Sequence, residues 1–269
     1  MDKKIIVANW KMNPQTLAEA EDLYRLSVGV IVCPPFVYLE ELSKIKSGAV
    51  LGSQDISLGD EPGQTGEISG RMLTQFGVKY VIVGHSERRW PRSRSSDGGS
   101  AVTGESGLAL RGESDAVVNA KIKMALAHEL TPIVCFGEKS RDNDFKTFLQ
   151  QQVSATFAGL SADQIEKCLI TYEPVWAIST NLNAKPDTPE NAVESINFIK
   201  NFLSKTYNLE LKISFLYGGS VNSANLASFL SRPEINGVLV GAASVNKDEF
   251  ARILSQMLTF TIENDIIKA

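Results

Sequence analysis

The chain has 269 residues, 43% of them hydrophobic, and a formal net charge of −4, which suits one large α/β domain or two small ones and gives no basic face for nucleic acid. No apolar run reaches the roughly 18 residues of a membrane span, and the first residues lack the apolar core of a signal peptide. Three cysteines without close pairing favour a reducing cytoplasm over disulfides or a zinc site, and we expect all three in the core: Cys33, Cys135 and Cys168.

Short apolar runs alternate with amphipathic stretches along the chain. Eight runs are predicted as strands: Ile5–Ala8, Val28–Cys33, Ala49–Gly52, Tyr80–Val83, Pro132–Phe136, Leu169–Tyr172, Ile213–Tyr217 and Val238–Val240. Seven stretches are predicted as helices: Thr16–Arg25, Val37–Ile45, Asp115–Glu129, Asp144–Phe157, Pro189–Lys205, Ser223–Leu230 and Asp248–Met257. Eight strands alternating with helices predict a closed (β/α)₈ barrel, in a single domain over residues 1–269, rather than an open sheet. No G-x-G-x-x-G motif follows a strand, which weakens a dinucleotide-binding interpretation.

One segment, residues 90–110, does not fit this pattern. It is rich in serine and glycine and has little periodicity. A structureless loop of roughly 20 residues is unusual inside a compact domain, so we predict a flexible insertion after the fourth strand. A surface loop without a role of its own is the favoured interpretation.

In a barrel, the residues that follow the strands share one rim, and barrel enzymes place their chemistry there. The first strand delivers Asn9 and Lys11, a hydrogen-bond donor and a cation, which we expect on the same side of an extended chain. The fourth strand delivers His85 and the sixth delivers Glu173, a candidate base just before Pro174 ends the strand. The alternative for Glu173 is that it caps the helix that follows.

Glycine-bearing turns follow the seventh and eighth strands, at residues 217–221 and 240–244. Backbone N–H groups and helix dipoles at such turns make anion sites, which is where barrels commonly hold phosphate. Each feature alone has an ordinary structural explanation, but acid, base, cation and anion site all falling at strand ends favours function. We expect Arg88 and Arg89 to make structural ion pairs, and His128 to be an ordinary surface or half-buried residue.

The sequence resembles the triosephosphate isomerase family. The matching stretches run in family order over nearly the whole chain: Asn9–Asn13, Cys33–Phe36, Thr65–Ser69, Val83–Arg89, Pro132–Glu138, Tyr172–Ile178 and Tyr217–Val221. The resemblance implies the interconversion of dihydroxyacetone phosphate and glyceraldehyde 3-phosphate through an enediolate, in glycolysis and gluconeogenesis, without metal or cofactor. It implies that Glu173 moves the proton, that neutral His85 and Asn9 polarise the carbonyl, and that Lys11 stabilises negative charge.

The resemblance also implies a phosphate site and a set of supporting residues. The phosphate would rest on backbone N–H groups of four residues: Ser179, Ser220, Gly241 and Ala242. Three residues would support the site: Ser86 by holding Glu173 in the open state, Glu87 beside Lys11, and Tyr217 at the seventh strand. A homodimer through the loop that carries Thr65 is implied as well, although the insertion at 90–110 lies near that interface and would either loop into solvent or remodel the pairing.

The sequence departs from the family in the lid after Glu173, where the usual Ile-Gly-Thr-Gly is replaced and Ser179 and Asn181 stand for glycines. A residue with a Cβ adopts φ > 0 less readily, so the open/closed balance is expected to shift. Ala242 also replaces a usual glycine and keeps its N–H. Two alternatives stay open: another phosphosugar barrel enzyme, such as an aldolase or epimerase, and a non-catalytic protein that kept the fold.

Overall fold

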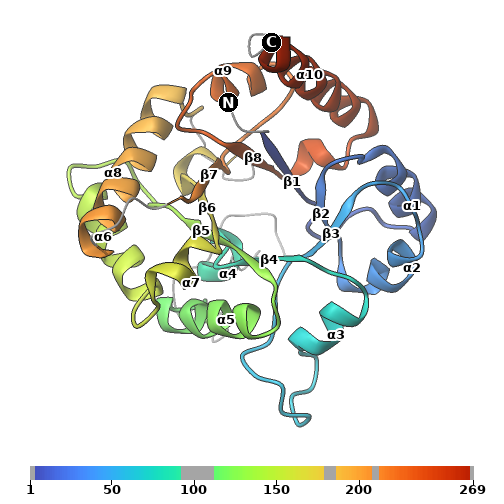
Figure 1. Ribbon diagram of the computed structural model, residues 1–269, viewed down its shortest axis with the longest axis horizontal. Coiled ribbons are helices and arrows are strands. Elements are labelled where there is room, and N and C mark those ends of the chain that lie inside the picture. The colour runs from blue at the N-terminus through green and yellow to red at the C-terminus, as the bar shows by residue number, and fades with distance from the viewer. Residues whose placement is uncertain (1–3, 92–111, 179–185, 208–211, 267–269) are drawn as a thin grey trace, which may run out of the picture.

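The computed structural model describes residues 4–91, 112–178, 186–207 and 212–266. Eight parallel strands close into a barrel in sequence order (Figure 1). They are β1 (Ile5–Asn9), β2 (Ile31–Cys33), β3 (Val50–Ser53), β4 (Tyr80–Val83), β5 (Thr131–Phe136), β6 (Leu169–Tyr172), β7 (Ser214–Tyr217) and β8 (Gly237–Val240). The predicted (β/α)₈ barrel is therefore confirmed, and all eight predicted strands occur within a few residues of their predicted bounds.

Helices surround the barrel on its outside, except α4, which lies at the barrel mouth (Figure 1). They are α1 (Leu17–Leu26), α2 (Leu39–Ser43), α3 (Gly70–Gln75), α4 (Ser86–Arg89), α5 (Asp115–Ala127), α6 (Phe145–Thr156), α7 (Ala162–Glu166), α8 (Pro189–Tyr207), α9 (Leu226–Leu230) and α10 (Lys247–Ile266). Three 3₁₀ turns add η1 (Phe36–Tyr38), η2 (Val175–Ala177) and η3 (Ala242–Ser244). Within the described residues no helix is both long and apolar enough to cross a membrane.

Local capping explains where helices begin. Thr16 and Glu19 form a reciprocal capping box at the start of α1. The sequence analysis did not predict α3 and α7, which span only six and five residues. Both begin at a serine that accepts the N–H three residues on, Ser69 for α3 and Ser161 for α7.

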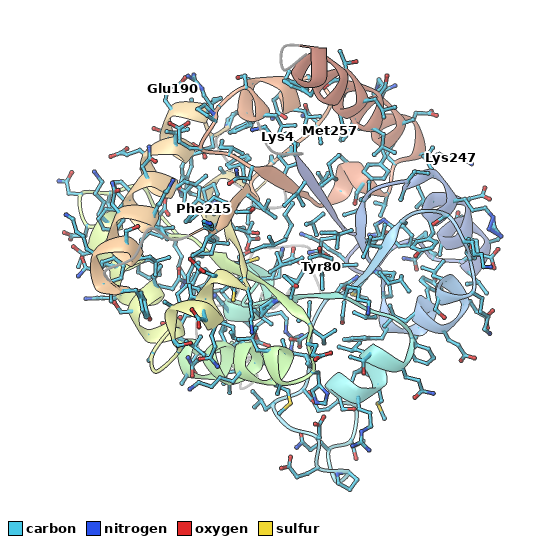
Figure 2. The ribbon with its side chains drawn as sticks, viewed as in Figure 1. Lys4, Tyr80, Glu190, Phe215, Lys247 and Met257 are labelled. Carbon is cyan, nitrogen blue, oxygen red and sulfur yellow. The ribbon has the colours of Figure 1, made fainter. Side chains whose placement is uncertain are left out.

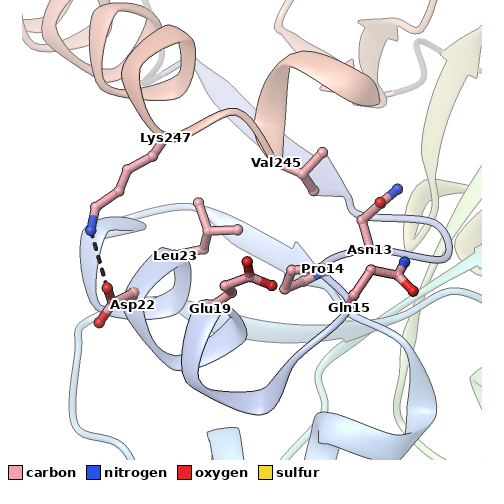
Figure 3. Close-up of a pocket in the computed structure, with 8 residues that line it drawn as sticks. All are labelled: Asn13, Pro14, Gln15, Glu19, Asp22, Leu23, Val245 and Lys247. Carbon is pink, nitrogen blue, oxygen red and sulfur yellow. Dashed lines mark hydrogen bonds and ion pairs between the residues drawn. The ribbon is translucent and has the colours of Figure 1, made fainter.

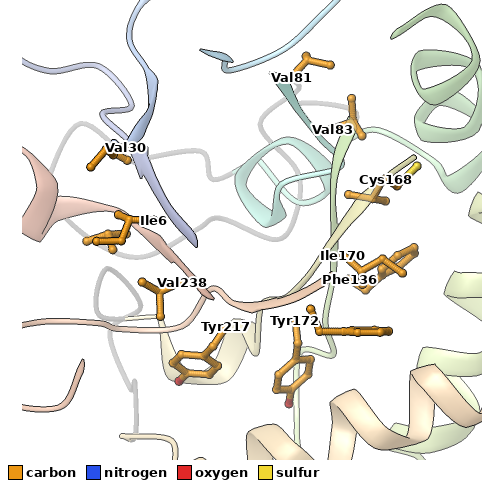
Figure 4. Close-up of a cluster of buried hydrophobic side chains, with 14 of the residues drawn as sticks. Ile6, Val30, Val81, Val83, Phe136, Cys168, Ile170, Tyr172, Tyr217 and Val238 are labelled. Atoms are coloured by element: carbon orange, nitrogen blue, oxygen red, sulfur yellow. The ribbon is translucent and has the colours of Figure 1, made fainter. Parts of the chain in front are cut away.

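Alternation along each strand divides the core into two parts. Inward-facing side chains fill the barrel: Val7, Ile31, Cys33, Ile82, Ile133, Cys135, Leu216 and Leu239. Their neighbours along the strands, such as Ile6, Tyr172 and Tyr217, point outward into a second cluster packed under the helices (Figure 4). Side chains fill the space between the strands and the surrounding helices (Figure 2). The three cysteines are buried and free, as predicted, and burial raises the pKa of Cys168 to about 12.

The predicted insertion at residues 90–110 lies, apart from its first two residues, outside the described part of the chain. Those two are Trp90, whose ring lies 6.3 Å from that of Phe148, and Pro91. The backbone is held together on both sides of this segment, because the N–H of Glu113 donates to the carbonyl of Arg88 at 2.9 Å. The end of α4 and the residues before α5 are therefore joined directly by this hydrogen bond.

Candidate active site

A cavity of about 350 Å³ opens at the carboxyl ends of the strands. Lys11, His85 and Glu173 line it together with the turns after β7 and β8. These residues come from loops after β1, β4, β6, β7 and β8, so the closed barrel brings together side chains that are far apart in sequence. Asn9 does not line the cavity; it lies beside it, 4% exposed.

Glu173 faces the barrel mouth because it continues the alternation of β6, in which Tyr172 points outward. It is buried, with 2% of its surface exposed. Three donors hold its carboxylate: the Ser86 N–H at 2.9 Å, the Ser86 hydroxyl at 2.7 Å and His85 Nε2 at 3.0 Å. Glu173 does not cap the helix that follows it, which was the alternative interpretation, since its side chain bonds Ser86 at the start of α4 across the barrel mouth.

The hydrogen bonds of His85 define its tautomer. His85 is the N-cap of α4, and its Nδ1 accepts the backbone N–H of Glu87 at 3.2 Å. An Nδ1 that accepts a hydrogen bond carries no proton, so the proton of the neutral ring lies on Nε2. Nε2 faces Glu173 and is therefore an N–H donor directed into the cavity.

Lys11 lies beside Asn9 for a different reason from the predicted one. The chain is not extended here: β1 ends at Asn9, and Lys11 has a left-handed backbone with φ of 54°. The side-chain oxygen of Asn9 accepts the Lys11 N–H at 3.1 Å and supports this turn. Lys11 Nζ then forms an ion pair with Glu87 at 2.7 Å, as the family resemblance implied.

Three of the four predicted phosphate contacts lie on the same cavity: Ser220, Gly241 and Ala242. The Ser220 hydroxyl donates to the carbonyl of Ala177 at 2.9 Å, which ties the β7 turn to the residues after Glu173. A Cβ placed on Gly241 would lie 3.6 Å from Lys11 Cε, so the β8 turn borders the ammonium. Ser179 and Asn181 lie outside the described residues.

Arg88, Arg89 and His128 make ion pairs with other residues and do not line the cavity. Arg88 pairs with Asp55 and Glu113, both at 2.6 Å, and Arg89 pairs with Asp115 at 2.5 Å. Lys121 joins the same network through Asp55 and Glu113. His128 is half-buried and contacts Asp60 at 2.6 Å, far from the cavity.

Two residues that the sequence analysis did not single out support the site. Gln54, directly after β3, donates to the carbonyls of Lys11 at 2.8 Å and Cys33 at 3.0 Å. A Cβ on Gly137 would lie only 1.8 Å from the carbonyl oxygen of Glu173, so only glycine lets the two backbones approach. Their positions just after strands were a usable signal, because the argument from strand ends applies to β3 and β5 as well.

A second pocket of about 420 Å³ lies beside the first, between α1 and the start of α10, and shares Asn13 with it (Figure 3). Its charged groups are already paired. Lys247 contacts Asp22 at 3.1 Å, and Glu19 accepts the Thr16 hydroxyl at 2.9 Å. This pocket therefore lacks, among the described residues, a lysine placed like Lys11 to bind an anion.

A (β/α)₈ barrel whose mouth joins a buried carboxylate, an imidazole, an ammonium and two glycine-bearing turns defines the class of barrel enzymes that move protons on phosphorylated sugars. The family model described as triosephosphate isomerase matches residues 4–257. The chain belongs to the triosephosphate isomerase family.

Individual relatives agree with the family model over nearly the whole chain. A protein named triosephosphate isomerase from Caldanaerobacter subterraneus is 37% identical, covering 95% of this chain and 100% of its own length. One of the same name from Dictyoglomus thermophilum is 39% identical, covering 94% of this chain and 99% of its own. Another from Carboxydothermus hydrogenoformans is 37% identical over 94% of this chain and 98% of its own.

Proposed function

We propose that this protein interconverts dihydroxyacetone phosphate and D-glyceraldehyde 3-phosphate, a step of glycolysis and gluconeogenesis, by proton transfer through an enediolate. The single observation that carries the proposal is the convergence of Lys11, His85 and Glu173 on one cavity bordered by the two glycine-bearing turns. Family membership supports the same reaction.

Glu173 is the proposed base. Its carboxylate takes the proton from the carbon beside the carbonyl, the C–H electrons form the double bond of the enediolate, and the proton returns to the neighbouring carbon. In the described arrangement the carboxylate is occupied by Ser86 and His85, so it must leave Ser86 to reach a substrate. Ser86 is accordingly proposed to hold the resting position of the base.

His85 and Asn9 are proposed to polarise the carbonyl, and Lys11 to stabilise the negative charge that develops. The Nε2–H of neutral His85 is a suitable donor, because an imidazolium would be a stronger acid than the enediolate requires. A neutral histidine in this role is a known property of the family. Glu87 fixes the Lys11 ammonium at the cavity wall.

The phosphate is proposed to rest on backbone N–H groups of Ser179, Ser220, Gly241 and Ala242. Gly241 is followed by the 3₁₀ turn η3, and backbone N–H groups at such a start attract anions. Tyr217, at the end of β7, packs against the turn that follows it: a Cβ on Gly219 would lie 2.1 Å from the Tyr217 hydroxyl oxygen. The methyl group of Ala242 leaves its N–H free to donate, so this departure from the family is expected to do little harm.

A cytoplasmic homodimer is proposed as the working form. The segment between β3 and α3, which carries Thr65, projects from the barrel, and residues 59–67 are at most partly covered (Figure 1). Large exposed apolar side chains follow the neighbouring strands β1, β2 and β3: Met12 at 87%, Val37 at 80% and Leu58 at 48% exposure. Such clustering on one side of a rim is typical of a protein–protein interface.

The two rival functions make different demands on the site. A Schiff-base aldolase needs a desolvated, neutral lysine, whereas Lys11 is ion-paired with Glu87. A metal-dependent epimerase needs clustered ligands, and among the described residues no group of three or more His, Cys, Asp or Glu side chains gathers to hold a metal. A non-catalytic relative would not need Glu173 held ready by three donors.

A coupled assay that follows dihydroxyacetone phosphate formed from glyceraldehyde 3-phosphate tests the proposal. We expect turnover by the purified chain without added metal, lost in Glu173→Gln, which keeps the shape of the side chain but not its basicity. A wild-type protein that is folded, binds inorganic phosphate and yet shows no turnover would support the non-catalytic alternative instead.

A further inference from the structure

Arg141 donates hydrogen bonds to four residues on two different elements. It lies in the loop after β5 and reaches over to β6 and α8, with 18% of its side chain exposed. Its Nη1 donates to the Tyr172 hydroxyl at 3.2 Å and to Ser195 Oγ at 2.7 Å. Its Nη2 donates to the carbonyl of Asn191 at 3.3 Å and to Glu194 at 2.5 Å.

On the β6 side these contacts lead directly to the proposed base. Tyr172 precedes Glu173, and its hydroxyl donates to Glu138 Oε1 at 2.7 Å. Burial and the nearby Glu138 raise the pKa of Tyr172, so the hydroxyl keeps its proton and can donate. Glu138 Oε1 also accepts the Trp176 indole N–H at 2.9 Å and lies 3.5 Å from Arg141 Nη1. Arg141 therefore fixes the residues on both sides of Glu173.

On the α8 side Asp187 lies two residues before the helix begins; burial raises the pKa of its carboxyl, and the positive charge of Arg141 acts to lower it. Asp187 Oδ1 accepts the Thr188 N–H at 2.8 Å, while Oδ2 is buried and completes no hydrogen bond with any described residue. Tyr217 and Asn191 lie close enough to act on this carboxylate, and Arg141 attracts it electrostatically. Asp187 is thus electrostatically linked to Tyr217 of the seventh strand, whose hydroxyl lies against Gly219 in the glycine-bearing turn of the cavity.

We infer that Arg141 is a positioning residue for the reaction, because one guanidinium holds both the β6 end that carries Glu173 and the start of α8. The inference rests on the proposed function. Arg141 is too far outside the barrel mouth to line the cavity, so it touches no substrate and acts through Tyr172 and Glu138. Its planar fork suits this bridging, since two nitrogens each serve two acceptors.

The competing explanation is that Arg141 only forms a surface ion pair with Glu194. Lys146 supplies the matched control, because it contacts the same Glu194 at 2.7 Å and shares the cation–π contact with Phe145. Within the described part of the chain, Lys146 makes no hydrogen bond to Tyr172 or Asn191. Removing either cation leaves Glu194 with one partner, but only Arg141→Gln frees Tyr172.

The test compares Arg141→Gln, Arg141→Lys and Lys146→Gln by steady-state kinetics, with folding checked by circular dichroism. We expect Arg141→Gln to lower kcat about tenfold with KM changed less than threefold, since a misplaced base slows chemistry more than binding. Arg141→Lys should recover part of kcat, and Lys146→Gln should stay within about twofold of wild type. A folded Arg141→Gln with wild-type kcat would overturn the inference.

A double-mutant cycle with Tyr172→Phe shows whether the effect passes through that hydroxyl. If it does, the losses in kcat from Arg141→Gln and Tyr172→Phe will be less than multiplicative, whereas independent effects multiply. Multiplicative losses would overturn the proposed route. The two proposals fail separately: an inactive wild type defeats the isomerase assignment, and an active wild type with an unaffected Arg141→Gln defeats only the role of Arg141.

Discussion

At the scale of single residues, the site depends on side chains that are held before substrate arrives. Glu173 is buried and bonded by three donors, and His85 receives a backbone N–H on the ring nitrogen that faces away from the base. Preorganised groups of this kind need little rearrangement during reaction, and much of an enzyme's rate enhancement is attributed to them. Small displacements should therefore affect turnover more than affinity.

Shortening Glu173 tests this sensitivity. Glu173→Asp withdraws the carboxylate by one methylene, and a misplacement of about 1 Å can cost about 100-fold in rate. We expect kcat to fall by about that factor with KM within a few-fold of wild type, measured in the coupled assay. Glu40→Asp, on the exposed face of α2, is the matched control and should behave as wild type. An unchanged kcat in Glu173→Asp would remove Glu173 from the role of base.

Asp187 gives a pH dependence that can be measured separately from activity. Burial raises its pKa, although Thr188, Asn191 and Arg141 act in the opposite direction. A carboxyl group with a raised pKa in the folded state favours folding when protonated, and this contribution disappears as pH rises through the raised value. At neutral pH the charged carboxylate is therefore a net cost to stability.

Replacing Asp187 by asparagine keeps the acceptor for the Thr188 N–H and removes the charge. We expect Asp187→Asn to raise the Tm by a few degrees at pH 7, with the difference shrinking as pH falls toward 4, in calorimetric scans across that range. Asp142→Asn is the control, since hydrogen bonds to Ser140 and Asp144 lower the pKa of that exposed carboxyl and predict the opposite sign. A lower Tm for Asp187→Asn at pH 7 would contradict the argument.

At the scale of elements, the junction of α4 and α5 is closed without the segment between them. The Glu113 N–H bonds the carbonyl of Arg88 at 2.9 Å, and their side chains pair at 2.6 Å. A Cβ on Gly112 would lie 1.8 Å from the Arg89 carbonyl and 2.9 Å from Pro91 Cδ, so the two ends already lie against each other. The network with Asp55 and Lys121 reinforces this junction from β3 and α5.

Deleting residues 92–111 and joining Pro91 to Gly112 should therefore preserve the fold. We expect kcat and KM within about twofold of wild type and a Tm changed by only a few degrees, because loop length has a weak effect on closure entropy. The same deletion combined with Arg88→Ala, which removes the side-chain contact to Glu113, should lower the Tm clearly. Loss of activity in a folded single deletion would give the segment a role.

The elements that could be predicted from sequence are those with a strong period. The strand β6 and the carboxylate after it follow from an apolar run ended by proline, and α1 follows from its capping box. The short helices α3 and α7 span too few residues to show a period. The positions of Gln54 and Gly137 directly after strands place them at the rim, but their contacts, and those of Arg141, depend on which loops are neighbours in space.

The left-handed backbone of Lys11 is a further limit of sequence analysis. Alternation along an extended strand correctly groups Asn9 with Lys11, but the chain turns after Asn9 and the grouping has another cause. Asn9 supplies that cause by accepting the Lys11 N–H, a local contact typical of asparagine. The sequence analysis thus grouped Asn9 and Lys11 correctly, but the extended backbone that it assumed between them was wrong.

At the scale of the whole molecule, the proposed dimer predicts which surface is an interface and which stays exposed. The exposed apolar residues Met12, Val37 and Leu58 follow the neighbouring strands β1, β2 and β3, and Leu58 belongs to the segment that carries Thr65. The helix α10, which carries Leu258 at 66% exposure, lies on the other side of the barrel from that segment (Figure 1). A charge placed at an interface disfavours association, whereas the same charge on a free surface has little effect.

Light scattering after size-exclusion chromatography measures the assembly directly. We expect wild type at micromolar concentration to have twice the 29.3 kDa mass of one chain. Thr65→Arg should shift the mass toward a single chain, and Leu258→Asp should leave it unchanged. A wild-type mass of one chain would contradict the proposed dimer.

The barrel closes where β1 pairs with β8, with Ile5 opposite Gly237. A Cβ on Gly237 would lie 2.2 Å from the Ile5 carbonyl, so the seam fits only when glycine stands there. A ribosome synthesises β1 before the seven other strands of the barrel and β8 after them. The edge of β1 that faces β8 therefore stays unpaired until the last strand has emerged, so the pairing of β8 is the step that closes the barrel.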